Sequence, residues 1–387
     1  MRVMACALTY PLPNGVTVSL DISADGILER GHDIKIVSPD YEKGRVRPEH
    51  EPVPSSILAN KAAESLLGRK ERVFGVGAGK EIRKISKEFN PDLYWLHTVT
   101  WSSNAFESHM LRSKKGKILF YHTWVEKYGE LYAGDAGAFL MKKRTKLLCN
   151  NMDAVMVPSG VVKEKLLEYG VRTPMHIVRT GVEPPNESFK REDLEKKFGI
   201  PKEQKILLYV GRISKEKNLM VLLDTLEYLR GKNEEVSLLL VGPGDLDKMT
   251  EEAKKRGVEK MVFCTGPLKR EEVKKIYGAC DVFVFPSKSE TQGIVLEEAM
   301  ASDIPVVALD SLIRNEIYPE GKALVAKEDS KFKEKVLEIL KDKEKREDMV
   351  REAKKFVLDN FSKEEMVKKQ MTIFEEVLKN KLEKNEE

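Results

Sequence analysis

The chain has 387 residues, of which 41% are hydrophobic and 34% are charged. This length is too great for one ordinary hydrophobic core and fits two α/β domains, and the composition is that of a globular protein with a heavily charged surface. The formal net charge of +4 is too small to indicate a nucleic-acid partner.

Short apolar strands and helical segments alternate through the first half of the chain. Strands are predicted at 3–8, 33–38, 93–97, 118–122 and 154–158, and a helix is predicted at 17–30, ending at Gly31. Such alternation indicates a parallel sheet that is covered on both faces. The first half is therefore predicted to be a doubly wound domain.

Two basic clusters occur in this half. Lys114, Lys115 and Lys117 form the first, and residues 142–146 contribute three lysines and one arginine to the second. The pattern has two interpretations, a solvated helix face or a surface that contacts anionic lipid. The sequence leaves both open.

The cysteines and the N-terminal residues bear on the cellular compartment. Cys6, Cys149, Cys264 and Cys280 have no Cys-x-x-Cys spacing and no histidine partners at metal-site distances, so we expect buried free thiols in a reducing compartment. The first ten residues resemble a strand rather than a signal peptide, and no apolar stretch approaches the length of a membrane span. These features predict a cytoplasmic protein.

A polar, proline-containing segment at 179–189 is the best linker candidate. Beyond it, strands are predicted at 206–210, 237–241, 262–264, 282–285 and 305–308. A second doubly wound domain follows, and the two domains are expected to face each other across a cleft. The tail from Ser362 onward is predicted to be a helix with an apolar stripe formed by Val367, Met371, Phe374 and Leu378.

The segment after the predicted strand 282–285 has the features of a phosphate site. A short polar turn leads from this strand into a helix that opens close to Gly293, so the free backbone amides of Gly293, Ile294 and Val295 lie at the positive end of the helix dipole. Glu290 and Glu298 flank these amides and could accept hydrogen bonds from hydroxyls, one from a sugar and one from a ribose. The arrangement predicts a nucleotide-sugar site.

Two cations follow another strand of the same predicted sheet. Arg212 and Lys217 lie directly after the strand 206–210, at the carboxyl edge where open α/β sheets bind ligands. Fixed cations beside a helix N-terminus could hold a diphosphate and neutralise it as it leaves.

Taken together, these motifs resemble a known family, the retaining glycosyltransferases of family 4, which have the GT-B fold of two Rossmann-like domains. The resemblance covers essentially the whole chain. Besides the segments above, it includes the Asn-Gly-Val loop at 14–16, Arg-Gly-His-Asp at 30–33, Tyr-His-Thr at 121–123, residues 153–159, Gly-Pro-Gly-Asp at 242–245, and Glu290 and Glu298 with seven residues between them.

The resemblance implies that the two domains bind different substrates. Residues 1–180 would form the acceptor-side domain, completed by a C-terminal helix at 362–387, and residues 181–361 would bind the nucleotide-sugar donor. Arg212 and Lys217 would hold the diphosphate with the amides of residues 293–295. Glu298 would bind the ribose and Glu290 the transferred sugar.

Two further residues receive roles from the resemblance. Gly15 would let the loop of the first domain approach the phosphates, because it has no Cβ. His122 would lie over the sugar near the anomeric centre. A satisfied core histidine is the alternative for His122; we expect His97 to be structural and His32, His50, His109 and His176 to lie on the surface or in loops.

The sequence also departs from the pattern of the family. Thr291-Gln292 replaces a common Gly-Phe pair, Asp303 replaces a glycine, and residues 310–316 lack the usual glycines. The resemblance implies transfer with retention, without a cofactor or a protein nucleophile, and no metal-binding Asp-x-Asp occurs near the donor residues. The donor base, UDP or GDP, and the sugar are left open.

The acceptor is predicted from the aromatic and basic residues of the first half. Residues 121–128 resemble the branch that glycosylates diacylglycerol-type lipids, and Trp95, Trp101 and Trp124 all fall in this part of the chain. A lipid acceptor would place the enzyme peripherally on the inner face of an anionic membrane. The tryptophans could equally be core residues. The alternatives are transfer to a soluble sugar or small molecule, a nucleotide-sugar epimerase, and a non-catalytic binding module.

Overall fold

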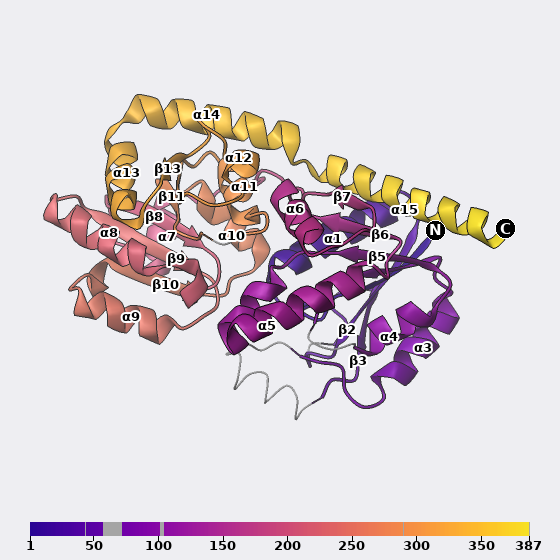
Figure 1. The fold of residues 1–387 in the computed structure, drawn as a ribbon. Coiled ribbons are helices and arrows are strands. Elements are labelled where there is room, and N and C mark those ends of the chain that lie inside the picture. Colours follow the sequence, from indigo (N-terminus) through magenta and orange to yellow (C-terminus); the bar gives the residue numbers. More distant parts are fainter. Residues whose placement is uncertain (43, 57–71, 101–103, 289, 387) are drawn as a thin grey trace. The chain divides into compact units, whose positions relative to one another are not determined.

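The computed structural model describes residues 1–42, 44–56, 72–100, 104–288 and 290–386 (Figure 1). The chain forms two compact units. The first contains Met1–Gly181 and Lys363–Glu387, and the second contains Val182–Ser362. Each unit is a parallel sheet between helices, the two-domain Rossmann-like architecture that the alternating pattern predicted.

Within the described residues, seven parallel strands form the sheet of the first unit, in the order β3-β2-β1-β4-β5-β6-β7. The strands are β1 (Arg2–Cys6), β2 (Asp33–Pro39), β3 (His50–Val53), β4 (Leu93–Leu96), β5 (Gly116–Phe120), β6 (Ala154–Val157) and β7 (Met175–Ile177). The edge strands β3 and β7 were not predicted, because they are short and lack the long apolar runs of the central strands.

Helices cover both faces of this sheet. They are α1 (Gly15–Glu29), α3 (Ala78–Phe89), α4 (Ala105–Arg112), α5 (Val125–Cys149), α6 (Gly160–Glu168) and α15 (Lys363–Glu386). Alternate residues of the central strands point to opposite faces. One face packs with α1 and α15, and the other packs with α3, α4, α5 and α6.

The C-terminal helix α15 packs on the first unit through its predicted apolar stripe. Phe374 is fully buried, and its ring meets that of Trp95 edge to face at 5.1 Å. Val367 contacts α1 so closely at Gly26 that a Cβ there would lie 2.4 Å from a valine methyl. This contact explains why a glycine stands inside α1.

The second unit has six parallel strands among its described residues, in the order β10-β9-β8-β11-β12-β13. They are β8 (Lys205–Val210), β9 (Val236–Val241), β10 (Val262–Gly266), β11 (Val282–Phe285), β12 (Val306–Leu309) and β13 (Leu324–Ala326). The helices are α7 (Arg191–Phe198), α8 (Met220–Gly231), α9 (Leu246–Lys255), α10 (Arg270–Tyr277), α11 (Ile294–Ala301), α12 (Arg314–Ile317), α13 (Asp329–Lys341) and α14 (Lys343–Asn360).

Several local expectations were wrong. The first helix begins at Gly15 rather than at residue 17, because the Asn14 side chain caps it by accepting hydrogen bonds from Val16 N and Thr17 N at 2.9 and 3.1 Å. His50 is not a surface residue. It is buried in β3, where its Nε2 lies 2.8 Å from Ser38 Oγ.

Two tryptophans agree with one of the interpretations left open above, and two cysteines differ from expectation. Trp95 and Trp124 are buried core residues, and Trp101 lies outside the described residues, so the core interpretation is correct for the two tryptophans that can be placed. All four cysteines are free; Cys6 and Cys149 are buried, but Cys264 and Cys280 are only partly buried. No helix in the described part of the chain has the length and apolar content needed to cross a bilayer.

Candidate functional site

The candidate donor site lies at the carboxyl edge of the second sheet. Strand β8 pairs in parallel with both β9 and β11, so the loops that follow these three strands start at the same edge. These loops begin at Gly211, Gly242 and Pro286 respectively. The sheet topology therefore brings together the segments that carry Arg212, Lys217 and Glu290.

Two glycine contacts fix the first of these loops. A Cβ on Gly242 would lie 2.0 Å from the carbonyl oxygen of Gly211, and a Cβ on Gly244 would lie 2.1 Å from that of Ile213. Both glycines also have φ values, +142° and +151°, that other residues rarely adopt. The Gly-Pro-Gly-Asp segment at 242–245 thus packs backbone against backbone on the loop that carries Arg212.

The ammonium group of Lys217 contacts the carboxylate of Glu290. Lys217 Nζ lies 2.5 Å from Glu290 Oε1, and the two side chains are only 14% and 15% exposed. Asn218, in a left-handed conformation with φ of 58°, anchors this turn by donating hydrogen bonds from Nδ2 to Pro286 O and Asp329 Oδ2 at 3.4 and 3.2 Å. The two residues predicted to act on diphosphate and sugar therefore contact each other directly.

Arg212 also has a carboxylate neighbour. Its guanidinium lies 3.2 Å from Glu216, and its backbone carbonyl accepts a hydrogen bond of 3.0 Å from the Tyr209 hydroxyl. Both cations of the loop are thus held next to carboxylates. An anionic ligand would compete with Glu216 and Glu290 for these cations.

The helix that follows Glu290 begins as predicted. Helix α11 starts at Ile294, with Gly293 as the preceding cap residue in a left-handed conformation of φ +82°. Gly293 is buried, and Ile294 and Val295 are partly buried. A Cβ on Gly293 would lie 3.1 Å from Leu296 Cδ1 and 3.3 Å from Ile313 Cδ1, so both conformation and space favour glycine here.

Glu298 is buried inside the second unit. Its carboxylate accepts a hydrogen bond of 3.1 Å from the Tyr277 hydroxyl and lies 3.7 Å from the Arg270 guanidinium. Burial raises the pKa of Glu298, and the nearby Arg270 opposes this effect. Gln292 is also buried and donates a hydrogen bond of 2.7 Å to Glu297, so this departure from the family pattern supports the interior of the loop.

In the first unit, His122 lies just beyond β5 and contacts His97, which directly follows β4. His122 Nε2 and His97 Nδ1 are 2.9 Å apart, and the rings are nearly parallel. His122 also stacks on Phe120, with ring centroids 3.9 Å apart. Burial lowers the pKa of His122 to about 3 and also lowers the pKa of His97, so both imidazoles are neutral at pH 7.

The contact between His97 and His122 was not predicted; His97 itself is buried, in agreement with the structural role expected for it. A signal was present, because His97 and His122 are the last residues of two consecutive predicted strands. Strands β4 and β5 are neighbours in the sheet, so the residues after them meet at one edge. Gly15, the remaining predicted site residue of this unit, is exposed as the first residue of α1.

The lowered pKa of His122 predicts that stability decreases with acidification. The unfolded imidazole has a pKa near 6.5 and binds a proton that the folded state excludes. This contribution is therefore complete above pH 6.5 and is lost as the pH falls towards 3. The free energy of unfolding, measured in urea, should decrease between pH 7.5 and 5.5 by about 1 kcal/mol less in His122→Gln than in the wild type. An equal decrease in both proteins would contradict a His122 that is held neutral in the folded state.

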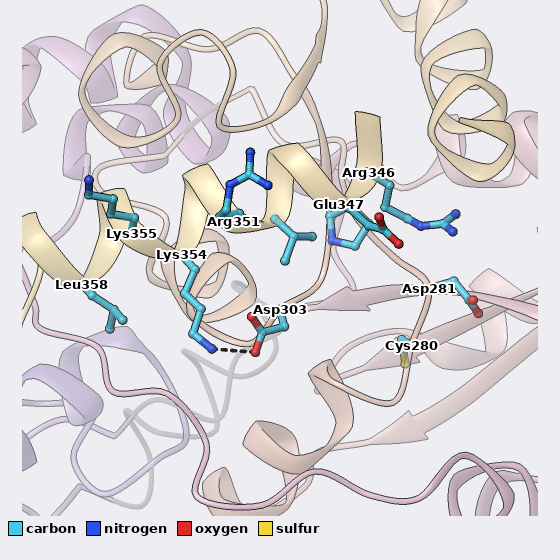
Figure 2. Close-up of a pocket in the computed structure, with 11 residues that line it drawn as sticks. Cys280, Asp281, Asp303, Arg346, Glu347, Arg351, Lys354, Lys355 and Leu358 are labelled. Carbon is cyan, nitrogen blue, oxygen red and sulfur yellow. Dashed lines mark hydrogen bonds and ion pairs between the residues drawn. The ribbon is translucent and has the colours of Figure 1, made fainter. Parts of the chain in front are cut away.

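A cavity of about 660 Å³ in the second unit lies at the opposite edge of the sheet (Figure 2). Its lining includes Cys280 and Asp281 before β11, Pro305 before β12, and several side chains of α14. Figure 2 shows Lys354 of α14 pointing to Asp303, with an ion pair of 2.7 Å. Because ligands bind at the carboxyl ends of parallel strands, this cavity is not part of the candidate site.

Two protein families match this chain, one for each unit. Residues 13–185 match the family described as Glycosyltransferase Family 4, and residues 190–356 match the family described as Glycosyl transferases group 1. Together the two matches span most of the chain.

Individual proteins are similar over shorter or longer stretches. An alpha-monoglucosyldiacylglycerol synthase of Streptococcus pneumoniae is 29% identical, over 64% of this chain and 60% of that protein, so the match spans less than two thirds of the relative. A GDP-mannose-dependent alpha-mannosyltransferase of Corynebacterium glutamicum is 25% identical, over 79% of this chain and 72% of its own length. The structure of Anabaena HepE with UDP and glucose shares the fold, with a TM-score of 0.77, 15% identity, and coverage of 97% of this chain and 100% of the other.

Proposed function

We propose that this chain, which belongs to the group 1 and family 4 glycosyltransferases of GT-B fold, transfers a hexose from a nucleoside-diphosphate sugar to an acceptor hydroxyl with retention of configuration. The observation that carries the proposal is the contact of Lys217 with Glu290 beside the first amides of α11. A cation, a carboxylate and a helix N-terminus are the groups that a sugar diphosphate needs. The combination of Arg212 and Lys217 with the Glu290 and Glu298 pair argues against an epimerase. A non-catalytic binding module would be expected to have lost His122 or Glu290, and both are present.

The chemistry follows from these groups. A diphosphate bound at the amides of residues 293–295 draws Lys217 away from Glu290, which can then accept hydrogen bonds from sugar hydroxyls. The acceptor oxygen forms a bond to the anomeric carbon on the face from which the diphosphate departs, and its proton passes to the leaving phosphate oxygen. Arg212 and Lys217 stabilise the negative charge that develops on that phosphate.

A donor panel tests this proposal. Hydrolysis and transfer are measured with UDP- and GDP-linked hexoses, because the similar proteins are described with GDP-mannose in one case and with UDP and glucose in another. We expect one base to be preferred. If no nucleotide sugar binds or reacts, the proposed function is wrong; release of an epimerised sugar without any acceptor would favour the epimerase.

For the acceptor we propose a diacylglycerol-type membrane lipid. The named activity of the Streptococcus pneumoniae relative supports this choice, and so does the basic composition of residues 142–146. The alternative is a soluble sugar or small-molecule acceptor, which would use the same donor residues. Transfer assays with diacylglycerol in mixed micelles and with soluble sugars distinguish the two.

Glu298→Gln should weaken nucleotide binding more than it slows the chemical step. A hydrogen bond to a ribose is made equally in the ground state and the transition state, so its loss raises KM and leaves kcat nearly unchanged. We expect the affinity for the free nucleoside diphosphate to fall about tenfold. Calorimetric titration checks this; a large loss of kcat at unchanged affinity would assign Glu298 to the chemical step instead.

Activity should persist in excess EDTA. In this proposal Arg212 and Lys217 supply the positive charge that a divalent cation supplies in other transferases. The initial rate is measured with and without the chelator, after removal of metals by dialysis. A loss of activity that only Mg²⁺ or Mn²⁺ restores would show that these two cations are insufficient.

A further inference from the structure

The second part of α5 exposes large apolar side chains. The helix has non-helical backbone angles at Ala133 and Gly134, and beyond this kink Phe139, Leu140 and Leu147 are 54%, 57% and 61% exposed. In the described part of the chain, no other stretch of similar length contains more than one exposed large apolar residue. Exposed apolar residues gathered on one surface mark a binding site more often than isolated ones do.

The opposite side of the same helix segment is fixed in the protein core. Met141, Leu148 and Cys149 are buried, and Arg144 forms an ion pair with the buried carboxylate of Glu107. Arg144, one of the four basic residues of the 142–146 cluster, is therefore not a surface cation. The segment cannot rotate to hide its apolar residues without breaking this ion pair.

Lysines accompany the exposed apolar residues. Lys142, Lys143 and Lys146 are all exposed, and Lys143 Nζ lies 4.4 Å from the ring centroid of Phe139, one helical turn away. The sequence from 136 to 149 contains no aspartate or glutamate, in a chain that is 34% charged. This surface is thus apolar and positively charged at once.

We propose that this surface, which we call the α5 ridge, binds an anionic lipid bilayer. The ridge consists of Phe139, Leu140, Lys142, Lys143, Lys146 and Leu147. Its apolar side chains would enter the region between headgroups and acyl chains, while the flexible lysine side chains extend to the lipid phosphates. The inference deepens the proposed function, since α5 begins three residues after His122.

The other basic cluster does not have these properties. Lys117 Nζ donates a hydrogen bond of 3.0 Å to the carbonyl of Ser113, and its ammonium group is half-buried near Lys381 and Asp153. None of the described residues that flank Lys114 and Lys115 is a large exposed apolar residue. The two clusters are therefore distinguishable by mutation.

Vesicle cosedimentation of the full chain tests the inference, with vesicles of phosphatidylcholine alone or mixed with phosphatidylglycerol. We expect binding to the anionic vesicles that decreases as salt rises. Replacing Lys142, Lys143 and Lys146 by glutamine should weaken binding about fivefold per lysine. The triple variant Phe139→Ser, Leu140→Ser and Leu147→Ser should bind the vesicles at least tenfold more weakly. A loss of binding that persists at high salt would reflect the apolar contact.

Matched variants control for general surface effects. Leu382→Ser changes an equally exposed leucine of the same unit, and Lys114→Gln with Lys115→Gln changes the other cluster; both should bind vesicles like the wild type. Circular dichroism confirms that each variant is folded. The inference is wrong if the wild type does not bind at low salt, or if the ridge variants bind as well as the wild type.

Two further measurements separate this inference from its alternatives. If sedimentation velocity without lipid shows a dimer that the serine variant abolishes, the ridge binds a second copy of the chain and the membrane assignment fails. Donor hydrolysis in the absence of lipid should be unchanged in the ridge variants. If vesicle binding depends on the α5 ridge but the protein transfers no sugar, the membrane inference is supported and the proposed function is wrong.

Discussion

Lys217→Ala is expected to lower the turnover of sugar transfer by two to three orders of magnitude, the loss typical of one preorganised charge contact in an active site. The Lys217 side chain is 14% exposed, and Asn218 anchors the turn that carries it, so the ammonium group needs only to exchange Glu290 for the diphosphate when the ligand binds. The positive charge of Lys217 stabilises the transition state most strongly, because negative charge develops on the diphosphate as it departs. Arg212→Ala should have an effect of similar size.

Single-turnover kinetics with saturating donor measure this loss apart from binding. Lys288→Ala is the matched control, because Lys288 follows the same strand as Glu290 but is 53% exposed and pairs with Asp329. Its rate should stay within about twofold of wild type, as is usual for exposed ion pairs. Lys217→Ala also deprives Glu290 of its cation, so the melting temperature is recorded for each variant. If both Lys217→Ala and Arg212→Ala have wild-type rates, these residues are not part of the active site.

The fold was largely predictable from sequence because central parallel strands are apolar along their whole length. Strand β11 was predicted with its observed bounds, and the other central strands were displaced by only one or two residues. Since each of these strands ends at the same edge of its sheet, the grouping of Arg212, Lys217 and Glu290 followed from strand positions alone. Their assigned chemical roles remain predictions.

The contacts that were missed depend on strand order and on side-chain direction, which a linear pattern does not contain. The ion pair of Arg144 with Glu107 joins α5 to α4 through two residues that are 37 positions apart in the sequence. Neither residue type indicates burial. His50 was expected on the surface or in a loop, and the strand that buries it, β3, was not predicted because it is short and contains a charged residue. Likewise, the contact of His97 with His122 arises because β4 lies beside β5 in the sheet.

This histidine contact leads to the second large effect that we expect. His122→Ala should lower kcat by about two orders of magnitude while the affinity for nucleoside diphosphate is unchanged. With its pKa lowered to about 3, His122 is neutral at pH 7, so in the role proposed for it the imidazole would act through a hydrogen bond rather than a charge. If that bond forms near the anomeric centre, it is strongest in the transition state, so its loss affects turnover.

His97 provides the test of how His122 is held. One of the two nitrogens, His97 Nδ1 or His122 Nε2, carries the proton of this hydrogen bond. Whether His97 Nδ1 donates or accepts therefore determines which nitrogen of His122 carries hydrogen. His97→Gln can keep a polar partner and should retain more activity than His97→Phe, which cannot. His176→Ala, in the edge strand β7, is the control and should leave kcat near the wild-type value. If His97→Phe is as active as His97→Gln while His122→Ala is inactive, the tautomer of His122 does not affect catalysis and His97 only fills space. If His122→Ala keeps full turnover, the imidazole does not contact the reacting sugar.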